Sequence, residues 1–222
     1  MIPMASRKTS LQPGHTKLPE KVPVFALPNV ILFPSVELPF YIFEPRYRQM
    51  LKDCASRDKF LAISLLKQGW ESKKEPVPSH EIVGVGYVRA VFDNPDGTSH
   101  ILLRGVGRAE IIRYVQLEPY RIAKIRELPD RIEDGRELSR LCEKLRRLLM
   151  QKMRLLSENP SRRMRFPKEL RNPIALSHIA SFLAQASPYL KQDLLETTNC
   201  NCRMRHLIGL YQEEIRPPGT QN

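Results

Sequence analysis

Few residues of this 222-residue chain have the spacing needed for metal chemistry. His80-Glu81 begins like the helix of a zinc protease, but Gly84 occupies the position of the second histidine. Cys200 and Cys202 could bind a metal with His206, yet structural zinc sites separate paired cysteines by at least two residues and need a fourth ligand. We therefore expect no metal and no cofactor, and we interpret the cysteine pair as part of a helix start.

Motifs for phosphate binding or nucleophilic catalysis are also missing. None of the ten glycines precedes a lysine, so the sequence contains no P-loop. The pairs Gly84/Gly86 and Gly105/Gly107 lack the third glycine of a dinucleotide-binding motif, and they lie inside strand-like runs, where they indicate bulges or strong coiling. No nucleophile elbow is present, although a site whose members meet only in the fold stays open. The sequence predicts binding rather than catalysis.

Positive charge is the second chemical feature. The formal net charge is +12, and residues 131–171 hold 13 Lys or Arg against 6 Asp or Glu. This basic segment could bind an acidic partner or a nucleic-acid backbone, or it could be a solvated helix face with a basic loop. The residues that would form the binding surface are Arg140, Lys144, Arg147, Arg154, Arg162, Arg163 and Arg165.

Composition sets broad limits on the protein class. An apolar content of 41% supports a hydrophobic core, and no apolar run approaches the roughly 20 residues that span a bilayer. The first 21 residues have no signal-peptide core and are expected to be a disordered tail, and residues 217–222 are expected to be a short tail. Four scattered cysteines give little reason to expect disulfides. We expect a cytoplasmic protein without a membrane segment.

Residues 22–130 carry strand signals with one inserted helix. Proline-broken apolar runs precede Glu44-Pro45, a helix start followed by apolar residues at helical spacing, which predicts a helix over 44–57. A long hairpin is expected from strands at 82–92 and 99–112 around the turn residues 93–97, followed by a strand at 120–128.

Residues 131–216 change to a helical period. A leucine stripe predicts one long helix over 133–157. Asn172-Pro173 and Ser187-Pro188 each resemble an N-cap followed by a first-turn proline, and a last helix begins near Asn199 or Asn201 and stops before Pro217. Strands followed by helices predict an α+β protein with a β-rich subdomain, 22–130, and a helical subdomain, 131–216.

One stretch resembles a known family. Leu27-Pro28, Phe33-Pro34, Leu38-Pro39 and the run Phe43-Glu44-Pro45-Arg46-Tyr47 are similar to the N-terminal, substrate-binding domain of Lon proteases. The resemblance extends over residues 22–215 and implies a PUA-like β pseudo-barrel with one inserted helix, followed by a C-terminal helical bundle. It also implies a stand-alone form, because the ATPase and peptidase modules of full Lon proteases are missing.

The function that this resemblance implies is a non-enzymatic module for protein quality control. It would bind unfolded or partly folded polypeptide segments, and a protease is a further candidate partner. The oligomeric state stays open. The candidate peptide-binding residues are Phe33, Pro34, Phe43, Glu44, Arg46, Tyr47 and Trp70, although bulky residues at proline corners could instead fill the core. The alternative function is an RNA-binding PUA-like protein that uses the basic segment.

Overall fold

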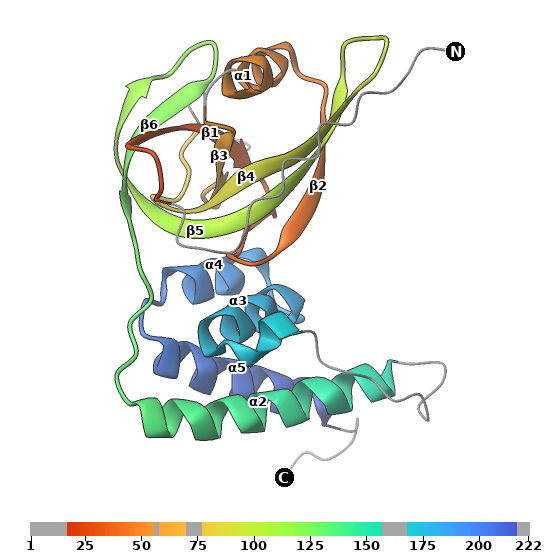
Figure 1. The fold of residues 1–222 in the computed structure, drawn as a ribbon, viewed down its shortest axis with the longest axis vertical. Helices are drawn as coiled ribbons and strands as arrows, with labels where there is room; N and C mark the ends of the chain where they lie inside the picture. The colour runs from red at the N-terminus through yellow and green to blue at the C-terminus, as the bar shows by residue number, and fades with distance from the viewer. Residues whose placement is uncertain (1–16, 56–57, 70–76, 157–167, 217–222) are drawn as a thin grey trace. The chain divides into compact units, whose positions relative to one another are not determined.

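The computed structural model describes residues 17–55, 58–69, 77–156 and 168–216. The chain divides into two compact units, Met1–Glu127 (unit 1) and Leu128–Asn222 (unit 2) (Figure 1). Unit 1 contains the sheet and one helix, and unit 2 contains the remaining helices. The predicted α+β class is confirmed.

Unit 1 is a curled six-stranded sheet. Strand β5 pairs with β4 along one edge, while its other edge pairs first with β2 and then with β6. Because β6 also pairs with β1, and β1 with β3 and β3 with β4, five strands close into a ring with β2 attached at the side. The strands and the inserted helix are β1 (Lys21–Leu27), β2 (Glu37–Ile42), α1 (Pro45–Ala55), β3 (Phe60–Leu65), β4 (Ile82–Asp93), β5 (Ser99–Gln116) and β6 (Arg121–Glu127).

Glycines let the segment between β1 and β2 lie directly on the sheet. A Cβ on Gly84 would stand 1.8 Å from the carbonyl oxygen of Leu32, and one on Gly105 would stand 2.0 Å from that of Phe33. The register of β4 and β5 shifts between Val85 and Gly86, beside Gly105. The prediction that these glycines mark bulges in a coiled sheet is confirmed, and the close approach adds a second reason for them.

Alternating strand residues supply two hydrophobic clusters. The first contains Phe25, Leu61 and Ile63 together with the apolar side of α1, which includes Tyr47 and Met50. The second contains the opposite residues of the same strands, such as Val24 and Ala62. Helix α1 begins and ends within two residues of its predicted bounds, and the carbonyl of Glu44 accepts its first hydrogen bonds, from the N–H groups of Tyr47 and Arg48.

Unit 2 is a helical bundle whose helix starts follow the sequence signals. The side chains of Asp134, Asn172, Ser187 and Asn199 accept hydrogen bonds from first-turn N–H groups, and prolines occupy the first turn after Asn172 and Ser187. The predicted long helix and the three that follow it are confirmed. Their bounds are α2 (Gly135–Leu155), α3 (Pro173–Leu183), α4 (Pro188–Glu196) and α5 (Cys200–Ile215), with a short 3-10 helix η2 (Lys168–Arg171) before α3. No helix among the described residues is long and apolar enough to span a membrane.

A buried polar network joins the start of unit 2 to two of its helices. Arg203 of α5 has no exposed surface and donates hydrogen bonds to the carboxylate of Asp130, to the Ser177 hydroxyl and to the carbonyl of Thr197. The ring of His178 in α3 lies 2.8 Å from the other carboxylate oxygen of Asp130. A charged group without exposure needs such partners, so this network fixes the chain entry against α3 and α5.

Candidate functional site

A cleft of about 530 Å³ opens in unit 1 where β1 and β6 separate. Pairing between these strands ends at Val24 and Arg121, and the cleft continues along β1 past Ala26 to Pro28. The start of α1 and the segment 117–120 line its sides, and Glu44, Arg46 and Tyr47 all contribute. The structure therefore brings three of the predicted peptide-binding residues together in one hollow.

Charge in this part of the cleft is largely compensated. The Nε of Arg46 lies 3.0 Å from a carboxylate oxygen of Glu44, and the same guanidinium lies 4.7 Å from the centre of the Tyr47 ring. The Tyr47 ring is buried against Phe25, with a centroid distance of 4.3 Å. The cleft therefore offers mixed apolar and paired polar surface rather than a single strong charge.

The remaining predicted peptide-binding residues are dispersed. Phe33 has no exposed surface, because its corner is seated on β5, so it offers nothing to a ligand and we remove it from the site. Pro34 is half-buried next to Phe33 and does not line the cleft. Phe43 is 58% exposed but outside the cleft. Trp70 lies outside the described residues.

A second surface in unit 1 is an exposed aromatic row across three strands. Tyr41 of β2 lies opposite His100 of β5, which in turn lies opposite Phe92 of β4. The Tyr41 and His100 rings are 4.8 Å apart between centroids, and Phe43 stacks on Tyr41 at 5.8 Å. Tyr41 and Phe92 are 47% and 56% exposed. We call these four residues the aromatic row.

Phe92 and His100 were missed by sequence reasoning. Directly opposite residues of an antiparallel pair share one face of a sheet, so the row exists only because of the register. Alternation along β5 places Ile101 and Leu103 in the core and His100 outside. Because Phe92 pairs with His100, it must also point outward. The alternation of apolar and polar residues along β5 was therefore the signal from which this face could have been predicted.

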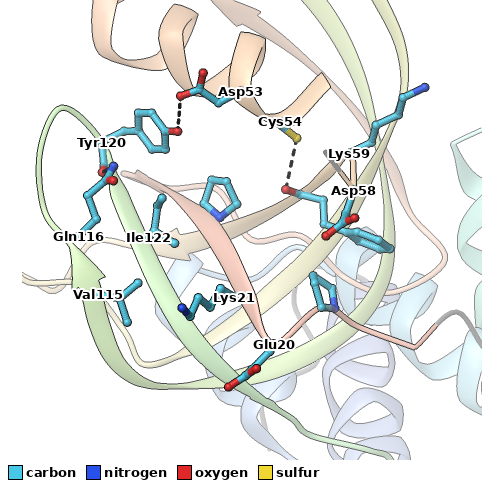
Figure 2. A pocket seen from close by; sticks show the side chains of 13 residues that line it. Glu20, Lys21, Asp53, Cys54, Asp58, Lys59, Val115, Gln116, Tyr120 and Ile122 are labelled. Carbon is cyan, nitrogen blue, oxygen red and sulfur yellow. Dashed lines mark hydrogen bonds between the residues drawn. The ribbon is translucent and has the colours of Figure 1, made fainter. Parts of the chain in front are cut away.

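Another hollow of about 590 Å³ lies near the opposite end of α1 and contains titratable groups (Figure 2). The Tyr120 hydroxyl donates a 2.5 Å hydrogen bond to Asp53, and the Cys54 thiol donates to the carbonyl of Phe60. Burial raises the pKa of the Cys54 thiol to about 12, so it stays protonated near neutral pH. Lys124, outside the hollow, pairs with Glu20 and lowers the pKa of that carboxyl. These contacts hold α1 and the strands together, and the buried Cys54 thiol is not an activated nucleophile.

The metal hypothesis gains no support from the described residues. Within them, no group of three or more His, Cys, Asp or Glu side chains is placed to hold a metal ion. Cys200 is buried in the first turn of α5, where its thiol lies 3.8 Å from the Ser177 hydroxyl, and Cys202 contacts Arg205 instead.

The basic segment is divided between structural and exposed cations. Arg146 donates to the carbonyls of Leu170 and Arg171, and Lys152 forms a 2.6 Å ion pair with Glu214. Three of the predicted surface residues, Arg140, Lys144 and Arg147, are exposed along one face of α2. Arg136 is exposed on the same face, and we call these four residues the basic face. Arg154 is exposed farther along α2, and Arg162, Arg163 and Arg165 lie outside the described residues.

Solved structures of similar fold define the class of protein. The N-terminal domain of Lon protease from the Mycobacterium avium complex superimposes with a TM-score of 0.66 at 18% identity, covering 87% of this chain and 98% of that one. A Lon N-terminal domain protein from Xanthomonas campestris gives a TM-score of 0.61 at 17% identity, covering 85% and 97%. The fold is that of Lon N-terminal domains, as the resemblance implied.

The sequence match then assigns the family. Residues 21–213 match the model of the ATP-dependent protease La (LON) substrate-binding domain, and the chain belongs to this family. Lon protease 2 of Sorangium cellulosum is 29% identical over 203 residues, covering 88% of this chain and 25% of the relative. Lon protease of Flavobacterium johnsoniae is 26% identical over 228 residues, covering 100% of this chain and 27% of the relative. The chain spans about a quarter of the length of the curated relatives it matches.

Proposed function

We propose that this protein recognises unfolded or partly folded polypeptide segments through unit 1, and that it acts by binding without catalysis. Membership of the substrate-binding family supports a recognition role in Lon-type proteolysis. We further propose that it works in the cytoplasm, where its four free cysteines stay reduced, and that it serves protein quality control with a protease as partner.

The aromatic row is the observation that carries this proposal. Large aromatic side chains are normally buried, whereas here Tyr41 of β2, Phe43 just after β2 and Phe92 of β4 each have roughly half of their surface exposed. His100 of β5 lies between Tyr41 and Phe92 in the register. Apolar segments are exposed in unfolded chains and hidden in folded ones. A rigid aromatic surface on a sheet therefore distinguishes unfolded from folded protein by burying apolar area.

Binding to a permanently unfolded polypeptide tests the proposal. Fluorescein-labelled, reduced and carboxymethylated lactalbumin is titrated with the whole chain, and anisotropy gives the dissociation constant. The triple variant Tyr41→Ser, Phe43→Ser, Phe92→Ser should weaken binding at least tenfold, because truncating central aromatic residues typically removes more than 1 kcal/mol each. The interaction should persist in high salt, since screening acts on charges and not on apolar contacts.

Ile112→Ser is the matched control. Ile112 lies on β5, the strand that carries His100 of the aromatic row. It is 46% exposed but is not part of the row. This variant should bind as the unchanged protein does. Equal affinity of the triple variant and the unchanged protein would contradict the proposal, provided that both retain the same circular dichroism spectrum.

The basic face supports a second candidate function, the binding of RNA. Its cations lie about one helical turn apart on the exposed side of α2, an arrangement that suits a line of phosphates. Binding of this kind should be lost in high salt, and Arg140→Gln with Lys144→Gln should lower the salt slope by about two counterions. RNA binding that is unaffected by high salt and by the double variant would exclude the basic face as the RNA-binding surface.

A further inference from the structure

The backbone of Ala26 faces the cleft. In the parallel pair of β1 and β3, the N–H of Leu66 donates to the carbonyl of Leu27, so Leu27 and Phe25 are the residues that bond to β3. On the other edge of β1, the N–H of Ile125 donates to the carbonyl of Glu20. Every second residue of a strand bonds to the same neighbour, so the even-numbered residues of β1 are those that bond to β6. The N–H and C=O of Ala26 therefore point toward β6.

Strand β6 does not reach Ala26. Its pairing with β1 ends at the pair Val24 and Arg121, and continuation of this register would place Pro119 opposite Ala26. Proline has no N–H, so it cannot complete a pair of ladder hydrogen bonds. The segment 117–120 forms the far side of the cleft instead. Ala26 is thus an open strand position that lies inside a hollow.

Other open strand edges of unit 1 carry features that discourage pairing. Pro39 lies on the outer edge of β2, with its ring turned away from β5, and Arg89 and Asp93 flank the end of β4 beyond its pairing with β3. Proline and charged residues on edges are the usual protection against strand addition. The open position at Ala26 itself carries neither a proline nor a charge, and Pro28 limits further pairing on the same edge. The cleft is bordered by the apolar side chains of Leu27, Leu66 and Leu117 and by charged residues that include Glu44 and Arg46.

We propose that the cleft binds an extended, apolar polypeptide segment as an added β-strand, whose backbone forms a pair of hydrogen bonds with the N–H and C=O of Ala26. This inference rests on the proposed function, because it assumes that the ligand is a polypeptide. Backbone pairing is independent of sequence, which suits a protein that recognises many unfolded chains. It requires an N–H at the paired residue of the ligand, so proline is excluded there.

Amide hydrogen exchange of Ala26 tests the inference directly. The probe is the shortest fragment of reduced, carboxymethylated lactalbumin that binds the whole chain. In the unbound protein, the Ala26 amide should exchange faster than the amides of Phe25 and Leu27, which bond to β3. Saturation with the fragment should slow exchange at Ala26 at least tenfold.

Two changes test the same hydrogen bonds from each side. Ala26→Pro removes the N–H, which faces away from β3, and should weaken fragment binding roughly threefold to tenfold, whereas Ala26→Ser should not. Methylation of backbone nitrogens along the fragment, one at a time, should reduce affinity at one position and spare its neighbours.

The outcomes separate this inference from the proposed function. A fragment that binds and leaves Ala26 exchange unchanged, or that tolerates methylation at every position, overturns strand addition and leaves the aromatic row as the binding surface. Failure of every polypeptide to bind overturns both proposals. Slowed exchange at Ala26 in the triple aromatic variant would show that the cleft binds independently of the row.

Discussion

Replacement of Gly105 by alanine should destabilise unit 1 severely. The added Cβ would lie 2.0 Å from the carbonyl oxygen of Phe33 and 2.8 Å from its carbonyl carbon. Both are backbone atoms, so no rotamer change relieves the contact, and the corner must move by about 1 Å or more to reach an allowed separation. That movement disturbs two 2.8 Å hydrogen bonds, from Ser35 N–H to the Gly105 carbonyl and from Gly105 N–H to the Val36 carbonyl.

The expected loss is about 2 to 6 kcal/mol in the free energy of unfolding of unit 1. Overpacking accounts for about 1 to 3 kcal/mol, and weakening of the two hydrogen bonds adds about 0.5 to 1.5 kcal/mol each. Because small domains are stable by only about 5 to 15 kcal/mol, this is a large fraction of the total. Urea unfolding followed by hydrogen exchange of unit 1 peptides measures this free energy separately from that of unit 2.

Two glycine variants are controls for this measurement. At Gly107, in the same strand, the new Cβ meets only the flexible end of Leu18, and the change should stay within about 1 kcal/mol. At Gly209, inside α5, nothing lies within 4 Å, so alanine should stabilise unit 2 by up to about 1 kcal/mol through helix propensity. A Gly105→Ala variant as stable as Gly107→Ala would refute the interpretation of Phe33 as a rigidly seated core residue.

Three further predictions concern the polar groups of both units. Arg203→Met should destabilise unit 2 by about 3 to 5 kcal/mol in urea unfolding, because it removes the cationic partner of a nearly buried carboxylate, whereas Arg205→Met at an exposed ion pair should have little effect; equal effects would contradict this. Alkylation by iodoacetamide at pH 9 should modify Cys202 and spare Cys54, since burial raises the pKa of the Cys54 thiol to about 12 and keeps it protonated there; mass spectrometry showing prompt modification of Cys54 would be the opposite result. The same raised pKa means that stability contributed by Cys54 is present below the unfolded thiol's ordinary pKa and is lost as pH rises toward 12. Tyr120→Phe should destabilise unit 1 by about 1 to 2 kcal/mol, through the lost hydrogen bond to a carboxylate, and an unchanged urea midpoint would refute that role.

Local sequence signals predicted the secondary structure well. The leucine stripe of α2, the proline-led starts of α3 and α4, and the turn between β4 and β5 depend on residues within a few positions of each other. The same locality explains why the Glu44-Pro45 helix start was predicted correctly. Such signals need no knowledge of distant strands.

The tertiary structure decided which residues of unit 1 are available to a ligand. Phe33 and Phe43 have similar sequence surroundings, yet one is fully buried and the other is largely exposed, because only Phe33 lies against β5. The aromatic row joins residues about 50 positions apart through strand register. The opening at Ala26 depends on where β6 begins, almost 100 residues later. Burial and strand edges are properties of long-range pairing, and periodicity along a single strand does not contain them.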